Sequence, residues 1–125
     1  MYIHTKEVVT LDHMVLADGV SVKCGQCLKV GKGGLVACAA NDKPEYISNA
    51  DMTGTEDGVT VACDKVTPDA VLEGELSADI EGLKIGDKLG LAADGVQLAA
   101  VEGGAFKVLG FDGNAAGCKV VCVVG

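Results

Sequence analysis

The chain has 125 residues, a net charge of −8 and 49% hydrophobic residues, but only 3% aromatic residues. All ten of its basic residues are lysines, whereas arginine is the residue that recognises phosphates and guanine through paired hydrogen bonds. This composition argues against nucleic-acid binding and against anionic membrane surfaces. We expect one domain whose core consists of small and branched aliphatic side chains.

The sequence predicts neither a membrane span nor a secretory signal. Its longest apolar stretches, residues 35–40 and 120–124, are far shorter than the roughly 20 residues that cross a bilayer. The first seven residues lack the apolar centre of a signal peptide, so we expect synthesis in a cytoplasm. We expect the six cysteines to stay free thiols there and four of them to pack as small hydrophobes.

Residues 1–14 form the first predicted unit, an N-terminal arm ahead of a β domain over residues 15–125. The arm has no helical stripe, and its run over residues 5–11 is rich in β-prone side chains. It holds too few apolar residues for a core of its own. We therefore expect it to add to the sheet edge of another chain, while the β domain folds without it. The residues expected to contact that partner are Tyr2, Ile3, Val8, Val9 and Leu11.

The rest of the chain alternates short apolar runs with turns. Four Asp-Gly pairs, at residues 18–19, 57–58, 94–95 and 112–113, favour tight turns between neighbouring antiparallel strands. A hairpin is predicted around Gly25-Gln26, a second turn over residues 31–34 and an exposed acidic loop over residues 49–58. The expected strands span residues 20–24, 27–30, 35–40, 46–48, 59–66, 71–76, 88–92, 96–101, 105–111 and 118–124.

This pattern predicts an all-β fold, a small barrel or sandwich of short antiparallel strands. At most one helical turn is expected, over residues 77–83. No internal repeat is strong enough to identify. In residues 118–124 one face of the predicted strand is wholly apolar and the other, with Lys119, nearly so, which indicates core on one face and a partner on the other. The high apolar content predicts self-association, most simply as a trimer.

Cys24 and Cys27, in the sequence Cys-Gly-Gln-Cys, form the sharpest chemical motif. Two thiols around a tight turn can bind zinc or form a redox pair. A structural zinc site needs four ligands, and Cys118 and Cys122 would lie roughly 13 Å apart in one strand. No predicted helix follows the motif, as a thioredoxin-like site requires. We therefore favour packing cysteines, with a small metal- or ligand-binding β module that uses Cys24 and Cys27 as the alternative.

No set of residues in the sequence suggests catalysis. His4 and His13 are the only histidines, and neither lies near a recognisable nucleophile. The acidic residues from 51 to 57 lack the alternating pattern of a calcium loop, and Glu73 and Glu75 fit the polar face of an ordinary strand. We therefore expect a protein that is not an enzyme and uses no cofactor.

Three stretches, residues 19–30, 35–48 and 103–124, resemble the capsid-decoration proteins of tailed bacteriophages, which are also called head-stabilisation or cement proteins. The resemblance implies a β-rich structural protein of the virion without enzymatic activity. It implies binding to the major capsid protein on the outside of an icosahedral head, commonly as a trimer that stiffens the shell. It also implies that the N-terminal arm pairs with the major capsid protein.

Overall fold

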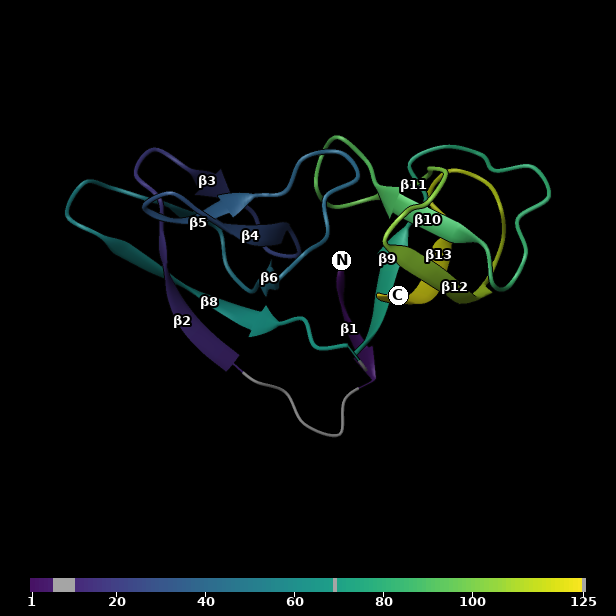
Figure 1. Ribbon diagram of the computed structural model, residues 1–125, viewed down its shortest axis with the longest axis horizontal. Coiled ribbons are helices and arrows are strands. Elements are labelled where there is room, and N and C mark those ends of the chain that lie inside the picture. Colours follow the sequence, from purple (N-terminus) through teal and green to yellow (C-terminus); the bar gives the residue numbers. More distant parts are fainter. Residues whose placement is uncertain (6–10, 69, 125) are drawn as a thin grey trace.

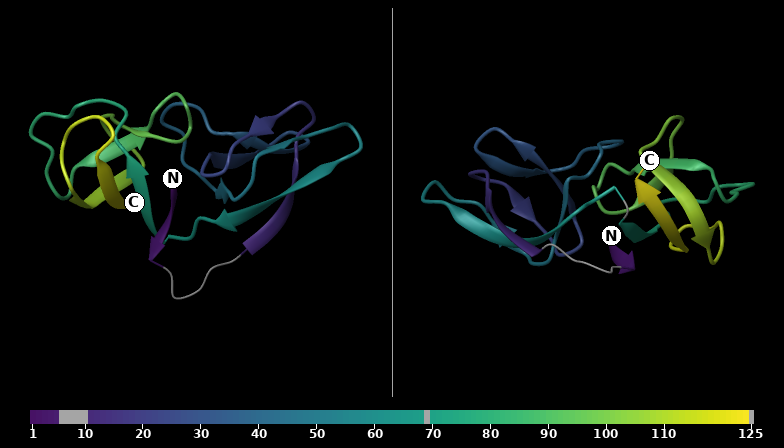
Figure 2. Two further views of the ribbon diagram at one scale, coloured as in Figure 1. Left: turned by 180° about the vertical axis from the view of Figure 1, so that it is seen from behind. Right: turned by 60° about the horizontal axis from the view of Figure 1, so that its bottom comes forward.

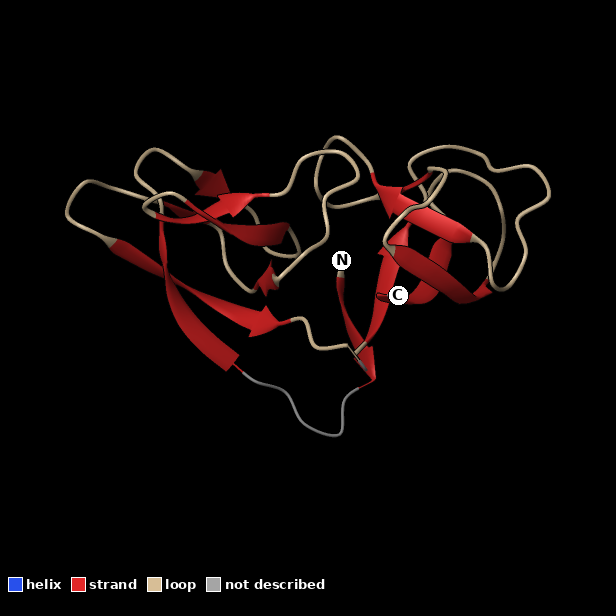
Figure 3. Ribbon diagram, viewed as in Figure 1, coloured by secondary structure: helices blue, strands red, loops and turns tan. Residues whose placement is uncertain are grey.

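The computed structural model describes residues 1–5, 11–68 and 70–124. Every described residue lies in a strand, a turn or a loop, which confirms the predicted all-β fold class (Figure 3). Within these ranges there is no helix that could cross a membrane. The strands are β1 Tyr2–Thr5, β2 Leu11–Leu16, β3 Ser21–Val22, β4 Cys27–Gly31, β5 Gly34–Ala37, β6 Tyr46–Ser48, β7 Met52–Thr53, β8 Val59–Lys65, β9 Val71–Glu75, β10 Lys88–Leu91, β11 Leu98–Ala100, β12 Phe106–Phe111 and β13 Lys119–Val124.

The strands form two halves that lie side by side along the long axis of the molecule (Figures 1 and 2). In the first half, β2, β5, β4, β6 and β8 close into a barrel, while β3 and β7 form a small separate ladder. In the second half, β1, β9, β13, β12, β10 and β11 form a six-stranded sheet in this order. A parallel bridge between Leu76 and Leu98 joins the end of β9 to β11, so this sheet also curls toward closure.

Both halves have the same strand order. We number five strands of each half along the chain: β2, β4, β5, β6 and β8, and then β9, β10, β11, β12 and β13. In each half the first strand meets the third in parallel. Antiparallel pairs then join third to second, second to fourth, fourth to fifth and fifth to first. The fold therefore contains an internal repeat, and the expectation that none could be identified is wrong at the level of structure.

The interiors of the two halves correspond residue by residue. Leu16 and Leu76 occupy equivalent places, because each meets a leucine of the third strand in parallel. All six buried residues of the first core have a buried counterpart in the second core. Strand register pairs Leu16 with Leu76, Leu28 with Leu89, Leu35 with Leu98, Val61 with Val120, and Cys63 with Cys122, and the equivalent turns that follow pair Val22 with Leu83.

One turn is reproduced almost atom for atom. In the first half, the Gln26 N–H donates to Lys23 O over 3.0 Å, and the Gln26 side-chain oxygen accepts from the Lys23 N–H over 3.0 Å. In the second half, the Asp87 N–H donates to Lys84 O over 3.1 Å, and the Asp87 carboxylate accepts from the Lys84 N–H over 2.8 Å. Residues 22–28 and 83–89, which contain these turns, share a lysine, a glycine and a final leucine at the same spacing.

The two halves pack through one outer face of the first barrel. Cys27, Cys38 and Ile47 lie on this face, and all three are buried within the hydrophobic cluster of the second half. We call these three residues the covered face. The Cys27 N–H also donates to Gly95 O of the second half over 2.9 Å. Because one apolar cluster crosses the boundary, the two halves form a single packed unit.

Several turn predictions are corrected by this topology. The Asp-Gly pairs at 94–95 and 112–113 do join paired antiparallel strands, whereas those at 18–19 and 57–58 lead into strands that are not sheet neighbours. The hairpin around Gly25-Gln26 is wrong, since β3 pairs with β7 and β4 pairs with β5. The turn over residues 31–34 is confirmed. Residues 77–83 form bends and turns instead of a helical turn. Local turn chemistry is compatible with either outcome, and closure of the barrels decides the pairing.

The N-terminal segment takes part in both halves. β1 pairs antiparallel with β9, and β2 pairs with β8 along its whole length. Residues 2–5 and 11–14 are therefore strands of this chain's own sheets, where a loose arm was expected. Backbone groups that we expected to be free for a partner bond within the chain instead. One side of β1 still forms the edge of the six-stranded sheet.

The C-terminal strand β13 turns one face toward the core, as predicted, although Val124 at its end is only half-buried. Val120 and Cys122 are buried in the core, while Val121 and Val123 on the other face are half-buried. The strand lies in the middle of the sheet, between β9 and β12. Coverage of its second face by a partner stays a prediction.

Candidate functional site

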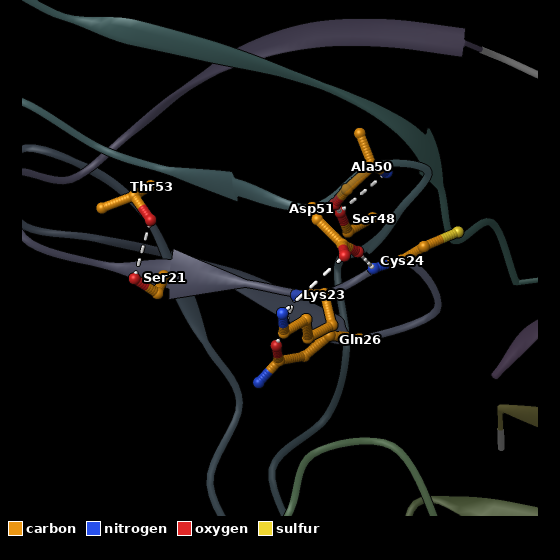
Figure 4. A network of polar contacts seen from close by, with 8 residues as sticks. All are labelled: Ser21, Lys23, Cys24, Gln26, Ser48, Ala50, Asp51 and Thr53. Atoms are coloured by element: carbon orange, nitrogen blue, oxygen red, sulfur yellow. Dashed lines mark hydrogen bonds and ion pairs between the residues drawn. The ribbon is translucent and has the colours of Figure 1, made fainter.

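The Cys-Gly-Gln-Cys motif lies in a hydrogen-bonded turn between β3 and β4 (Figure 4). The Cys24 N–H donates to Asp51 Oδ1 over 2.8 Å. Asp51 Oδ2 lies 3.7 Å from Lys23 Nζ. Asp51 belongs to the predicted acidic loop, and its carboxylate holds the turn in place. These contacts give the motif a structural role.

The two thiols of the motif lie in different environments. Cys24 is exposed, whereas Cys27 is buried and its Sγ lies 3.9 Å from Met1 Sδ. Burial raises the pKa of Cys27 to about 12. Zinc binds the thiolate form of cysteine, so this environment disfavours a zinc site at Cys27. No group of three potential metal ligands occurs among the described residues.

The two histidines lie on separate strands. His13 is exposed on β2, and His4 lies on β1. Among the described side chains, no hydrogen bond joins His13 to a nucleophile. A triad-like arrangement requires a nucleophile and base within hydrogen-bond reach, so the described part of the chain offers no support for such chemistry.

The paired carboxylates of β9 border a small hollow. Glu73 lies opposite Val121 and Glu75 opposite Lys119 in the sheet. Both glutamates line a pocket of about 190 Å³ next to Met1. Small-molecule sites usually enclose roughly 300–1,000 Å³, so this pocket is smaller than a typical ligand site.

The predicted partner-binding residues are spread over two sheets. Tyr2 and Ile3 lie on β1, at the edge of the six-stranded sheet, and Leu11 begins β2 in the barrel. Val8 and Val9 lie outside the described residues. The structure therefore does not gather these residues into one site, and their contact with a partner stays a prediction.

The covered face has an uncovered counterpart in the second half. Strand register makes β10 and β12 the equivalents of β4 and β6. The counterparts of Cys27, Ile47 and Cys38 are Lys88, Lys107 and Val101, and we call these three residues the open face.

The open face carries two adjacent positive charges. Lys88 and Lys107 are exposed and directly opposite each other in the sheet, an arrangement that costs about 0.2–1 kcal/mol. Neither lysine forms an ion pair within the described residues. A hollow of about 440 Å³ beside them is lined by apolar residues that include Leu83 and Val101, and also by Lys88, Asp87 and Glu102. Sequence reasoning missed this site, and only the short match between residues 22–28 and 83–89 could have revealed it.

A second, partly exposed apolar surface lies on the outer side of the six-stranded sheet. Leu109 is 41% exposed there, and Val71, Val121 and Val123 are half-buried. Cross-strand pairing places Val71, Val123 and Lys107 in one row across β9, β13 and β12. We call the four apolar residues the outer apolar patch.

No protein-family model matches this chain, and no curated protein is significantly similar to it. The resemblance to capsid-decoration proteins therefore stays a prediction.

Proposed function

We propose that this chain is a structural protein that binds the outer surface of a tailed-bacteriophage capsid and stabilises the head as a trimer. The observation that carries the proposal is the outer apolar patch, in which Leu109 is exposed and three valines are half-buried. Apolar sheet faces of this kind are typical of surfaces that associate with other proteins. On this proposal the partner is the major capsid protein, and the site of action is the virion exterior after synthesis in the host cytoplasm.

The remaining features are consistent with a role in assembly and not in catalysis. The described chain gathers no nucleophile, base or metal-ligand set, and its polar contacts hold turns in place. The chain contains no arginine and has a net charge of −8, which disfavours contact with packaged DNA. The free edge of β1 offers a place for strand addition by the shell.

Binding to capsids tests the proposal directly. Purified full-length chain is mixed with heads assembled from the major capsid protein encoded beside its gene, and sedimentation measures the bound fraction. We expect saturable binding and a higher melting temperature of the heads. Leu109→Glu should weaken binding about tenfold or more, because it places a charge in a buried contact. Val30→Glu is the matched control, since Val30 is an exposed strand residue of the first half. Absence of wild-type binding would refute the proposal.

The alternative metal-binding module is tested separately. Zinc is measured in protein purified without chelator, and the Cys24→Ser/Cys27→Ser variant is examined for folding. We expect no stoichiometric zinc and a folded variant, with a loss of about 1–3 kcal/mol because a hydroxyl replaces the buried Cys27 thiol. Stoichiometric zinc together with an unfolded variant would favour the metal-binding module.

A further inference from the structure

The covered face shows what kind of group fits against this part of the barrel. A turn of the second half occupies it: the Gly95 N–H donates to Ala92 O over 3.0 Å, and Gly95 O accepts from the Cys27 N–H over 2.9 Å. Asp94, the third residue of the turn, lies close enough that its carboxylate adds to the effect of burial in raising the pKa of Cys27. The occupant is thus a tight turn with an acidic third residue and a glycine in fourth place.

The same turn occurs at residues 55–58. The Gly58 N–H donates to Thr55 O over 3.1 Å, as the Gly95 N–H donates within its own turn. Gly58 and Gly95 both have positive φ, at 89° and 69°. The acidic third residue is Asp57, and Glu56 precedes it.

The turn at residues 55–58 is exposed and available. Glu56 and Asp57 are both exposed, and neither forms a hydrogen bond or ion pair within the described residues. The turn precedes β8 at the end of the molecule that points away from the second half (Figure 1). It therefore cannot reach the open face of its own chain.

We infer that the turn at residues 55–58 of one copy binds the open face of a second copy, with Glu56 and Asp57 facing Lys88 and Lys107. The open face is the structural counterpart of a face that the same type of turn already occupies. Two carboxylates without partners match two lysines without partners, and such complementarity fixes both partner choice and register. The contact is head-to-tail, the kind of contact that forms a ring when its rotation closes, and the proposed trimer is such a ring.

Other turns of the chain fit the open face less well. The Asp94-Gly95 turn is already used within the chain. Its counterpart in the first half, the turn over residues 31–34, carries Lys32, which would repel the two lysines. In the Asp18-Gly19 turn the Val20 N–H closes the hydrogen bond, so the glycine lies in third place. The Asp112 carboxylate already accepts from the Lys119 N–H over 2.8 Å.

The inference rests on the self-association that the proposed function includes, but not on capsid binding, so it is tested on the full-length chain alone. Sedimentation velocity measures association at low and high salt. Lys88→Glu/Lys107→Glu and Glu56→Lys/Asp57→Lys should each raise the dissociation constant about tenfold or more, and high salt should weaken wild-type association. Combining all four changes should restore most of the association, because the charges are exchanged. Lys32→Glu/Lys43→Glu, at two other exposed lysines, is the matched control and should leave association unchanged.

Three outcomes would overturn the inference. The first is a wild-type chain that stays monomeric at every concentration. The second is association that neither charge reversal weakens, or that the four-fold exchange does not restore. The third is a monomeric chain whose capsid binding is lost in Lys88→Glu/Lys107→Glu, which would assign the open face to the shell subunit. In that last case the capsid function survives and the contact between copies does not. If the wild-type chain does not bind capsids but the four-fold charge exchange restores association, the proposed function fails and the contact between copies stands.

Discussion

The two halves have equivalent interiors, but the equivalent outer face is buried in the first half and exposed in the second. In the first half Cys27 and Ile47 are buried against a neighbouring barrel, whereas in the second half Lys88 and Lys107 occupy the equivalent places in solvent. Interior positions are restricted by close packing, while an outer position is restricted only by what covers it. The comparison shows that one fold can present a packing surface in one copy and a binding surface in the other.

A second difference explains how the halves fit together. The turn between β4 and β5 is tight, whereas β10 and β11 are joined by a longer loop over residues 92–97. That loop reaches the first half through the Gly95 carbonyl. At the base of each connection, Val30 is 58% exposed and its counterpart Leu91 is 1% exposed. The longer loop therefore provides a contact between the halves, and the Asn41 N–H of the first half also donates to Leu91 O over 2.9 Å.

Exchanging residues between the covered face and the open face is expected to have the largest effect on the free energy of unfolding. Ile47→Lys should lower the free energy of unfolding by about 3–5 kcal/mol, because it buries an unpaired charge. The reverse change, Lys107→Ile, should alter it by no more than about 0.5 kcal/mol, because the position is exposed. Urea unfolding followed by circular dichroism measures both. A mild effect of Ile47→Lys would show that the covered face is not buried in solution.

Equivalent core truncations test whether the halves unfold together. Leu28→Ala and Leu89→Ala each remove a buried leucine at the same place in the repeat, and each should cost about 2–4 kcal/mol. Because Cys27, Cys38 and Ile47 of the first barrel are buried in the hydrophobic cluster of the second half, both variants should shift one common transition. Two separate transitions in thermal unfolding would show that the halves are independent.

The buried thiols make the free energy of unfolding depend on pH in the alkaline range. Burial raises the pKa of Cys27, Cys38 and Cys122 to about 12, above the ordinary value of 9.0. The folded state therefore favours the protonated thiol. The contribution of these thiols to the free energy of unfolding is fully present below pH 9 and is lost as the pH rises toward 12. Each thiol contributes a slope of up to about 1.4 kcal/mol per pH unit.

Urea unfolding at several alkaline pH values measures this slope in the wild type and in two cysteine variants. Burial also raises the pKa of Cys63, the counterpart of Cys122. Cys122→Ala should reduce the slope, whereas exposed Cys24→Ala should leave it unchanged. An equal slope in the wild type, Cys122→Ala and Cys24→Ala would contradict the burial of Cys122.

The smallest expected effect distinguishes the two equivalent glycine turns. Gly25 and Gly86 have φ values of +87° and +94°, so alanine should cost about 1–2 kcal/mol at either position. Gly25→Ala should cost up to about 1 kcal/mol more, because its added Cβ would lie 3.3 Å from backbone atoms of Met1, whereas nothing lies near Gly86. Equal losses in thermal unfolding would show that Met1 does not pack there.

Much of the secondary structure could be predicted from local pattern. The strands near residues 27–30, 59–66, 71–76, 105–111 and 118–124 follow apolar runs bounded by glycine and aspartate. The buried face of β13 could be predicted because alternation in a strand has a period of two. The pairing of β3 could not be predicted, since its partner β7 lies in a stretch with the composition of a loop.

The candidate site was largely beyond sequence reasoning. Cys24 and Cys27 attracted attention by their spacing, yet one thiol is exposed and the other is in the core. The sequence did not suggest Lys88 and Lys107 as a site, because they are 19 positions apart and become neighbours only when β10 pairs with β12. Sequence spacing identifies groups within one turn or strand, and it carries little information on pairs that a sheet brings together.

By itself, the sequence determined the all-β character, the turns and the apolar core positions, because side-chain alternation and glycine conformation are local properties. Only the tertiary structure decided that the chain folds as two halves with the same strand order, a closed barrel and a curled sheet, with β1 added to the sheet. It alone decided that one face is buried while its counterpart is open. Those outcomes depend on which strands meet and on which loop reaches across, and the free energy of such contacts comes from residues far apart in the chain.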